Sequence, residues 1–240
     1  MWRWTKRAII RLYYTVGRHL IEIDKGGRAA FAQQRRASPN KFVIGIDEVG
    51  RGSLAGPVVV AAVALPPGFK INDLCFGKKR CRLKDSKKLS KHQRLLWWQW
   101  LKNNPQARFS LARVYPPVID QINIARAANL AATRACRKLA VVGKVLLDGN
   151  LKISNGLGVA YRTIIKGDEK YNVIKLASIV AKVHRDRLMM KNDRLYRGYG
   201  FACHKGYGTK QHIAAIEKQG LCPIHRRSFK LNLDPRAGLS

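Results

Sequence analysis

Residues 42–65 read FVIGIDEVGRGSLAGPVVVAAVAL. The stretch contains two apolar runs rich in Val and Ile, Phe42–Ile46 and Pro57–Leu65, joined through a Gly-rich turn. Short apolar runs bounded by turn residues are typical of buried strands, so we expect two strands that pair antiparallel. Asp47 and Glu48 stand where the first strand ends. The stretch therefore predicts the start of a sheet with two carboxylates at a strand end.

The rest of the chain alternates apolar runs with longer helical stretches. Three further strands are predicted at Ala107–Tyr115, Lys144–Leu147 and Val159–Ile165. Helices are predicted at Ser90–Asn103, Val118–Ala140, Tyr171–Tyr196 and Thr209–Lys218, and turns at Pro66-Pro67-Gly68 and Pro116-Pro117. This order predicts an α/β fold with a mixed five-stranded sheet flanked by helices and with a C-terminal helical part.

The charge of the chain is strongly unbalanced. Its 240 residues include 47 Lys and Arg against 14 Asp and Glu, which gives a formal net charge of +33. Basic side chains that neutralise phosphates release counterions, so nucleic acid is the favoured partner. An anionic membrane surface ranks second and a ribosome-like RNA third, and a generally basic proteome remains an alternative explanation of the charge.

Cysteines and apolar runs indicate the compartment. Five cysteines, Cys75, Cys81, Cys136, Cys203 and Cys222, form neither a CxxC pair nor a zinc-ligand spacing. They predict free thiols in a reducing compartment, so we expect a cytoplasmic protein. No apolar run approaches the roughly 20 residues of a membrane span, so no membrane partner is expected. We expect a monomer.

The chain divides by composition into three regions. Residues 1–40 carry nine Lys and Arg against Glu22 and Asp24 and form a basic N-terminal extension. Aromatic and aliphatic residues between Trp2 and Val16 make its first part amphipathic enough for a helix. The extension would provide either extra nucleic-acid contact or organelle targeting, since import signals are also Arg-rich and poor in acids. The catalytic domain is expected over residues 41–230, and residues 231–240 form a C-terminal tail.

Carboxylates are rare in this chain, and four of them follow predicted strands. Asp47 and Glu48 end the first strand, Asp148 ends Val145-Leu146-Leu147, and Asp168 follows Ile164-Ile165-Lys166-Gly167. In α/β proteins, ligands bind beyond the carboxyl ends of strands. A single Asp there is more often a turn or capping residue, but four together would repel one another without a cation. Oxygen ligands suit Mg²⁺ or Mn²⁺, and two such ions about 4 Å apart can serve phosphodiester hydrolysis.

Two further acids have simpler explanations and are placed outside this cluster. Asp85, in Lys84-Asp85-Ser86-Lys87-Lys88, is expected to cap the helix that follows. Asp186 lies inside a predicted helix between Arg185 and Arg187, so we expect it to form an ion pair.

The stretch Gly45-Ile46-Asp47-Glu48-Val49-Gly50-Arg51-Gly52-Ser53-Leu54-Ala55-Gly56-Pro57-Val58-Val59 resembles the opening signature of the ribonuclease HII family. The resemblance continues in family order over residues 42–229. Its further blocks are Asp85-Ser86-Lys87-Lys88-Leu89-Ser90, Ile119-Asp120 with Asn123-Ile124, Leu147-Asp148-Gly149-Asn150, Lys166-Gly167-Asp168, Ala177-Ser178-Ile179-Val180-Ala181-Lys182-Val183 with Arg185-Asp186, His204-Lys205-Gly206-Tyr207-Gly208-Thr209, and His225-Arg226-Arg227-Ser228-Phe229. Ile174-Lys175-Leu176 and Cys203 depart from the family pattern, and residues 1–40 match nothing in the family core.

The resemblance implies a ribonuclease H-like fold and a metal-dependent endonuclease. Its catalytic and metal-binding residues would be Asp47, Glu48, Asp148 and Asp168, holding two Mn²⁺ or Mg²⁺ ions. The substrates implied are RNA/DNA hybrids and duplex DNA with embedded ribonucleotides, cut 5′ to the ribonucleotide to leave 3′-hydroxyl and 5′-phosphate ends. The residues Gly50, Arg51, Gly52 and Tyr207 would read the junction between ribonucleotide and DNA, because glycine allows close backbone approach and only the 2′-hydroxyl distinguishes RNA.

Several polar side chains are candidates for contacts to the substrate backbone. The lysines are Lys87, Lys88, Lys182 and Lys205, and the hydroxyl donors are Ser86 and Ser178. Any one of these lysines alone would more often be solvated surface.

Three alternatives remain at this point. A ribonuclease HIII would carry an N-terminal platform domain and a Glu as its last carboxylate, whereas this chain has a short extension and Asp168. A type 1 ribonuclease H lacks the Asp-Glu pair followed by Gly-Arg-Gly. A non-catalytic RNA-binding protein would not need to keep all the carboxylates.

Overall fold

A computed structural model describes residues 12–16, 19–23, 42–76 and 79–231. The chain forms two compact units, Met1–Pro39 and Asn40–Ser240. In the first unit, β1 (Leu12–Val16) pairs antiparallel with β2 (His19–Ile23). The predicted N-terminal helix is therefore wrong for Leu12–Val16, where Tyr, Thr and Val favour a strand, and the rest of that prediction lies outside the described residues.

The second unit is built on a mixed five-stranded sheet with the strand order β7-β4-β3-β8-β9. The strands are β3 (Phe42–Val49), β4 (Val58–Leu65), β7 (Arg108–Val114), β8 (Gly143–Asp148) and β9 (Tyr161–Ile164). The pairs β3–β4 and β4–β7 are antiparallel, and β3–β8 and β8–β9 are parallel. The predicted antiparallel start and the mixed sheet are confirmed, and the parallel pairs come from β8 and β9 alone, since β7 joins the sheet antiparallel.

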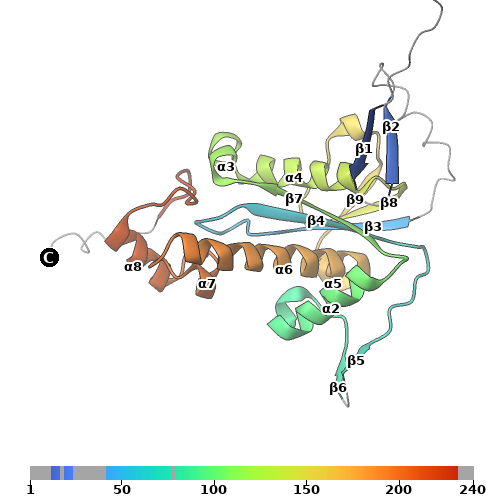
Figure 1. The fold of residues 1–240 in the computed structure, drawn as a ribbon, viewed down its shortest axis with the longest axis horizontal. Coiled ribbons are helices and arrows are strands. Elements are labelled where there is room, and N and C mark those ends of the chain that lie inside the picture. The colour runs from blue at the N-terminus through green and yellow to red at the C-terminus, as the bar shows by residue number, and fades with distance from the viewer. Residues whose placement is uncertain (1–11, 17–18, 24–41, 77–78, 232–240) are drawn as a thin grey trace, which may run out of the picture. The chain divides into compact units, whose positions relative to one another are not determined.

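Helices cover both faces of this sheet (Figure 1). On one face lies α4 (Ile124–Leu139), which contacts β4 and β7 through a buried row of alanines. On the other face α6 (Asn172–Leu195) crosses β3 and β4, and α2 (Lys91–Asn103) packs against α6. Every residue of β4 is buried, as expected for a central strand with both faces covered. One apolar core therefore lies on each side of the sheet.

Gly45 explains how closely α6 approaches the central strand. A Cβ atom at Gly45 would lie 2.4 Å from the backbone carbon of Val173 and 2.5 Å from the amide nitrogen of Ile174. Only a residue without a side chain fits there. The first turn of α6 is thus held against β3, two residues before Asp47.

The single helix predicted at Val118–Ala140 is wrong, because the structure has α3 (Pro116–Ile122) and α4 in its place. Asn123 separates them with a φ of 65°, and its side chain accepts a hydrogen bond from Arg126 N at 3.0 Å. An Asn at such a position both tolerates the left-handed backbone and caps the next helix. Pro116 and Pro117 begin α3, where a missing N–H costs nothing, and so do not form the predicted turn.

Several short elements were not predicted. They are the hairpin β5 (Leu74–Phe76) and β6 (Lys79–Cys81), the 3-10 helices η2 (Ser86–Lys88) and η3 (Asn155–Leu157), and the one-turn helices α5 (Gly167–Lys170) and α7 (Phe201–His204). The predicted C-terminal helix is present as α8 (Lys210–Gln219). Segments of three or four residues are too short to show a hydrophobic period.

All five cysteines are free thiols, as predicted. No helix among the described residues is long and apolar enough to cross a membrane.

Candidate active site

Adjacent strand ends and one short helix bring the acidic residues together. Asp47 follows Ile46 in β3, and Ile46 pairs in parallel with Leu147, the residue before Asp148 in β8. Asp168 lies in α5, directly after β9. One carboxylate oxygen from each of Asp47, Asp148 and Asp168 lies within 4.8 Å of the others. This is the cluster expected from strands whose carboxyl ends share one edge of the sheet.

Backbone amides hold two of these carboxylates in place. Asp148 Oδ1 accepts hydrogen bonds from Gly167 N at 2.6 Å and from Asp168 N at 3.3 Å. A Cβ at Gly167 would lie 2.6 Å from Ile174 Cδ1, so this position in α5 favours glycine. Asp47 Oδ1 accepts from Glu48 N at 2.7 Å. Backbone amides therefore fix the positions of the Asp148 and Asp47 carboxylates.

Burial and mutual repulsion disfavour the charged forms of this cluster. Burial, followed by the charges of Glu48 and Asp148, raises the pKa of Asp47 well above its usual value. Burial is also the largest cause of the raised pKa of Glu48 and of Asp148, and Asp168 adds to the latter. Buried like charges without a compensating cation are costly.

The cations nearby compensate this cluster only in part. Lys87 Nζ lies 3.5 Å from Asp168 Oδ2, and Arg51 Nη1 lies 3.5 Å from Glu48 Oε1. The side chain of Lys87 is 81% exposed, so its attraction is screened by solvent. Glu48 Oε2 is buried and has no hydrogen-bond partner among the described residues. An orphaned carboxylate oxygen beside three clustered ones fits a hard divalent cation, which prefers oxygen ligands.

A cavity of about 470 Å³ contains this cluster and most of the predicted substrate-binding residues. Its lining consists of Asp47, Glu48, Val49, Gly50, Arg51, Gly52, Ser86, Lys87, Asp148, Asp168, Ser178, Lys182 and Tyr207. Two predicted site residues are not part of this lining. Lys88 Nζ instead lies 3.4 Å from Glu169 Oε1, and Lys205 Nζ donates to Ala202 O.

The side chains around the cluster are linked to one another. The hydroxyl oxygens of Ser86 and Ser178 lie 2.8 Å apart and join η2 to α6. Asp85 accepts from Lys87 N at 3.0 Å and so caps η2, a short helix that was not predicted. The helix predicted at Ser90–Asn103 is capped by Ser90 instead. The ion pair predicted for Asp186 is also confirmed, with Lys182 Nζ at 2.8 Å as its partner.

Two buried arginines that bind backbone carbonyls near the cavity were not singled out from the sequence. Arg185 and Arg226 are 0% and 1% exposed, and each donates to backbone carbonyls. The guanidinium of Arg185 lies 5.4 Å from the ring centroid of Tyr207. Both residues lie in blocks that resemble the family, but arginine is rarely buried, and only the fold shows what they contact.

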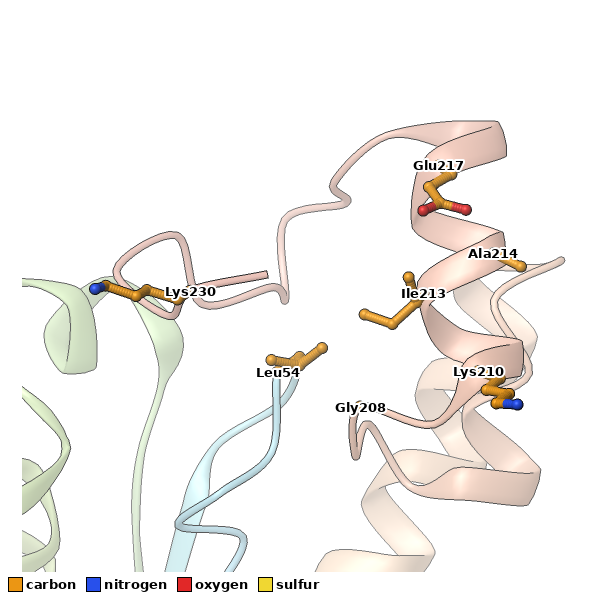
Figure 2. Close-up of a pocket in the computed structure, with 7 residues that line it drawn as sticks. All are labelled: Leu54, Gly208, Lys210, Ile213, Ala214, Glu217 and Lys230. Atoms are coloured by element: carbon orange, nitrogen blue, oxygen red, sulfur yellow. The ribbon is translucent and has the colours of Figure 1, made fainter. Parts of the chain in front are cut away.

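A second cavity of about 480 Å³, shown in Figure 2, shares no lining residue with the first. It is lined by Leu54, Gly208, Lys210, Ile213, Ala214, Glu217 and Lys230. Among the described residues, Glu217 is the only acid that lines this cavity, so they offer no comparable metal site there.

Comparison with known proteins gives a consistent result. The family model described as Ribonuclease HII matches residues 44–232. The ribonuclease HII of Chlorobium chlorochromatii is 45% identical over 192 residues, which cover 80% of this chain and 90% of the relative. That of Pelodictyon phaeoclathratiforme is 46% identical over 191 residues, covering 79% and 90%.

Solved structures show the same fold. The structure of the PCNA:RNase HII complex from Archaeoglobus fulgidus has a TM-score of 0.61 and 25% identity, covering 80% of this chain and 97% of that one. The structure of Bst-RNase HIII in complex with Mn²⁺ has a TM-score of 0.52 at 16% identity, covering 87% and 81%. The sheet is thus that of ribonuclease H2 and HIII structures, as the resemblance implied. The chain belongs to the ribonuclease HII family.

Proposed function

We propose that this chain hydrolyses the phosphodiester on the 5′ side of a ribonucleotide in RNA/DNA hybrids or in duplex DNA, leaving 3′-hydroxyl and 5′-phosphate ends. The observation that carries the proposal is the cluster of buried Asp47, buried Asp168 and half-buried Asp148 inside a cavity of a strongly basic chain. Membership of the ribonuclease HII family supports the reaction class.

The carboxylates would hold divalent cations, Mn²⁺ or Mg²⁺, with two ions in the complete site. Asp47, Asp148 and Asp168 offer converging oxygens, and Glu48 offers the unpartnered Oε2. Bound cations would lower the pKa of the attacking water and neutralise charge on the phosphate and on the leaving oxygen. The protein's own contribution is a fixed geometry, since the amides of Gly167 and Asp168 hold the Asp148 carboxylate before any substrate arrives.

Substrate recognition is assigned to the basic and glycine-rich side of the same cavity. Gly50, Arg51, Gly52 and Tyr207 would read the junction at the ribonucleotide, where the 2′-hydroxyl is the distinguishing group. Lys87 reaches into the cavity beside Asp168 and would meet a phosphate there. The other phosphate contacts proposed are those of Ser86, Ser178, Lys88, Lys182 and Lys205. The three lysines among them would first have to leave their present partners.

The proposal is tested with a DNA duplex that contains one ribonucleotide, incubated with Mg²⁺, with Mn²⁺ or with a chelator. We expect cleavage only with a divalent cation, and none by Asp47→Asn or Asp148→Asn, although both should still bind the duplex. Glu169→Gln is the matched control, because Glu169 neighbours Asp168 but lies outside the cavity lining. Near-normal turnover by either Asn variant would refute the metal-site assignment.

A further inference from the structure

The loop between β3 and β4 is held by a segment far along the chain. Leu54 N and Ala55 N donate to Gly206 O at 2.8 and 3.2 Å, and Arg226 N donates to Leu54 O at 2.8 Å. Ser53 also forms an isolated bridge with Tyr207. The glycine-rich loop is therefore positioned by the C-terminal segment as well as by its own strands.

The side chain of Arg226 makes the most extensive of these contacts. Its guanidinium donates to Gly50 O at 2.6 Å, to Arg51 O at 2.8 Å and to Gly56 O at 2.9 and 3.0 Å. The group is 1% exposed and lies 5.0 Å from the ring centroid of Phe229. Within the described part of the chain no carboxylate pairs with it, so backbone carbonyl dipoles compensate its charge.

These contacts fix the direction of two peptide groups. The Gly50 carbonyl shares its peptide with the Arg51 amide, and the Arg51 carbonyl shares its peptide with the Gly52 amide. Both peptides are trans, so each N–H points away from the carbonyl that Arg226 holds. Neither amide donates a hydrogen bond to any part of the chain that the structure describes. Arg226 thus leaves two unused donors in a loop that lines the acidic cavity.

The space beside Gly52 is open. A Cβ built on Gly52 would meet no atom within 4 Å, although Gly52 lines the cavity that holds the carboxylates. Unused amides beside open space are where a ligand oxygen can be accepted at little cost, because the backbone is already in place. A ribonucleotide differs from a deoxyribonucleotide in that region by one oxygen, the 2′-hydroxyl.

We propose that Arg226 is a positioning residue for ribonucleotide recognition, which orients the amides of Arg51 and Gly52 toward the ribose 2′-hydroxyl. This inference rests on the proposed function. Arginine suits the role because its planar fork spans several carbonyls at fixed angles, whereas a lysine ammonium is a single point of contact. Arg185 is equally buried, but it binds the carbonyls of Ala55, Pro57 and Lys205 and not those of Gly50 and Arg51.

Arg226→Lys tests the proposal, because it keeps the charge and removes the fork. Affinity is measured in chelator, where cleavage is absent, for a duplex with one ribonucleotide and for the same duplex made entirely of DNA. We expect binding of the ribonucleotide duplex to weaken about tenfold, the effect of roughly one hydrogen bond, with all-DNA affinity within about twofold of wild type. With Mg²⁺, kcat/KM should fall by at least the same factor.

Arg108→Lys is the matched control. Arg108 also donates to backbone carbonyls, those of Pro105 and Ala107, but pairs with Ala64 at the end of the sheet away from the loop. It should leave both affinities unchanged. Equal weakening on both duplexes by Arg226→Lys would mean that the amides contact a phosphate. Wild-type affinity for both duplexes would mean that Arg226 does not set the preference for the ribonucleotide. Either result overturns the inference. Absence of cleavage by the wild-type protein would instead overturn the proposed function.

Should Arg226→Lys fail to fold, judged by circular dichroism, the wild-type protein provides the test. The backbone amide resonances of Arg51 and Gly52 should shift more on binding the ribonucleotide duplex than on binding the all-DNA duplex. Equal shifts would overturn the inference.

Discussion

The charged side chain of Asp47 destabilises the metal-free protein, as expected for a residue that binds a cation. Burial and two neighbouring acids raise its pKa, so its charged form destabilises the fold when no cation is bound. Asp47→Asn should therefore raise the melting temperature in chelator and abolish the rise that Mg²⁺ or Mn²⁺ produces in the wild type. A stabilisation of 1 kcal/mol corresponds to about 2–4 °C for a domain of this size.

Differential scanning calorimetry with and without the cation measures both effects, and Glu169→Gln should change neither. A variant that melts lower than wild type in chelator, yet is still stabilised by metal, would contradict the account of Asp47.

Three buried histidines make stability depend on pH in a predictable direction. His212 is fully buried between His204, at a ring distance of 4.3 Å, and His225, whose Nε2 lies 3.1 Å from its own. Burial lowers the pKa of His212 from 6.5 to about 4. Between these values the unfolded chain binds a proton that the folded chain does not, so the free energy of unfolding falls as pH is lowered from 6.5 toward 4.

The expected loss from His212 is on the order of 3 kcal/mol, because each pKa unit corresponds to about 1.36 kcal/mol. The raised carboxyl pKa values act in the opposite direction over the same range, so His212→Asn is needed to separate the two. Urea unfolding at pH 7.0, 5.5 and 4.5 should show a steeper loss for wild type than for His212→Asn. Parallel curves would show that His212 does not titrate as described.

For single residues, the sequence predicts the role of some residue types and not of others. Acids at strand ends are visible as a pattern, so the sequence predicts that Asp47, Asp148 and Asp168 lie close together, as they do. The roles of Arg226 and His212 were not visible, because their partners are carbonyls and rings from distant segments, and no local spacing reports such contacts. Glu48 was assigned from the same pattern, yet the cluster within 4.8 Å comprises only the three aspartates.

Among the elements, the contact between β3 and α6 is the one that positions the site. Gly45→Ala would place a Cβ 2.4 Å from the backbone of Val173, so α6 would have to move. Overpacking of this kind costs about 1–3 kcal/mol. Because Ser178 on α6 faces the carboxylates, cleavage should also slow.

Chemical denaturation and the cleavage rate together test this contact. Gly156→Ala is the control, since its nearest neighbour would be at an ordinary 3.8 Å. Wild-type stability in Gly45→Ala would show that α6 can be displaced freely.

Element prediction succeeded where apolar runs were long and failed where backbone conformation decided the outcome. The five strands of the large sheet were all expected, because Val- and Ile-rich runs signal burial directly. The division of one predicted helix at Asn123 depends on a positive φ, which a helical period does not reveal. The strand at Leu12–Val16 was mistaken for a helix because a run of apolar and basic residues satisfies either pattern.

For the whole molecule, the net charge of +33 predicts salt-sensitive binding to duplex DNA. Residues 1–40 carry nine of the basic side chains and none of the proposed catalytic groups, so we propose that they add affinity. Deleting them should weaken binding and leave kcat unchanged. The salt-dependence slope should fall by about one unit for each phosphate that the shortened chain no longer neutralises.

Filter-binding titrations across a salt series measure this slope for the full chain and for the truncated one. Mass measurement of the native protein first establishes whether the segment is retained, because an import signal would be removed. For a retained segment, an unchanged slope after truncation would exclude the DNA-contact role.

With divalent cations held by its carboxylate cluster, the protein is proposed to hydrolyse the bond 5′ to a ribonucleotide. The most direct measurement maps the ends produced from an end-labelled duplex with a single ribonucleotide, with Mg²⁺ and with chelator. We expect one cut, 5′ to the ribonucleotide, with 3′-hydroxyl and 5′-phosphate ends, and only with the cation. Cleavage in chelator, or a cut that leaves a 2′,3′-cyclic phosphate through attack by the ribose itself, would contradict it.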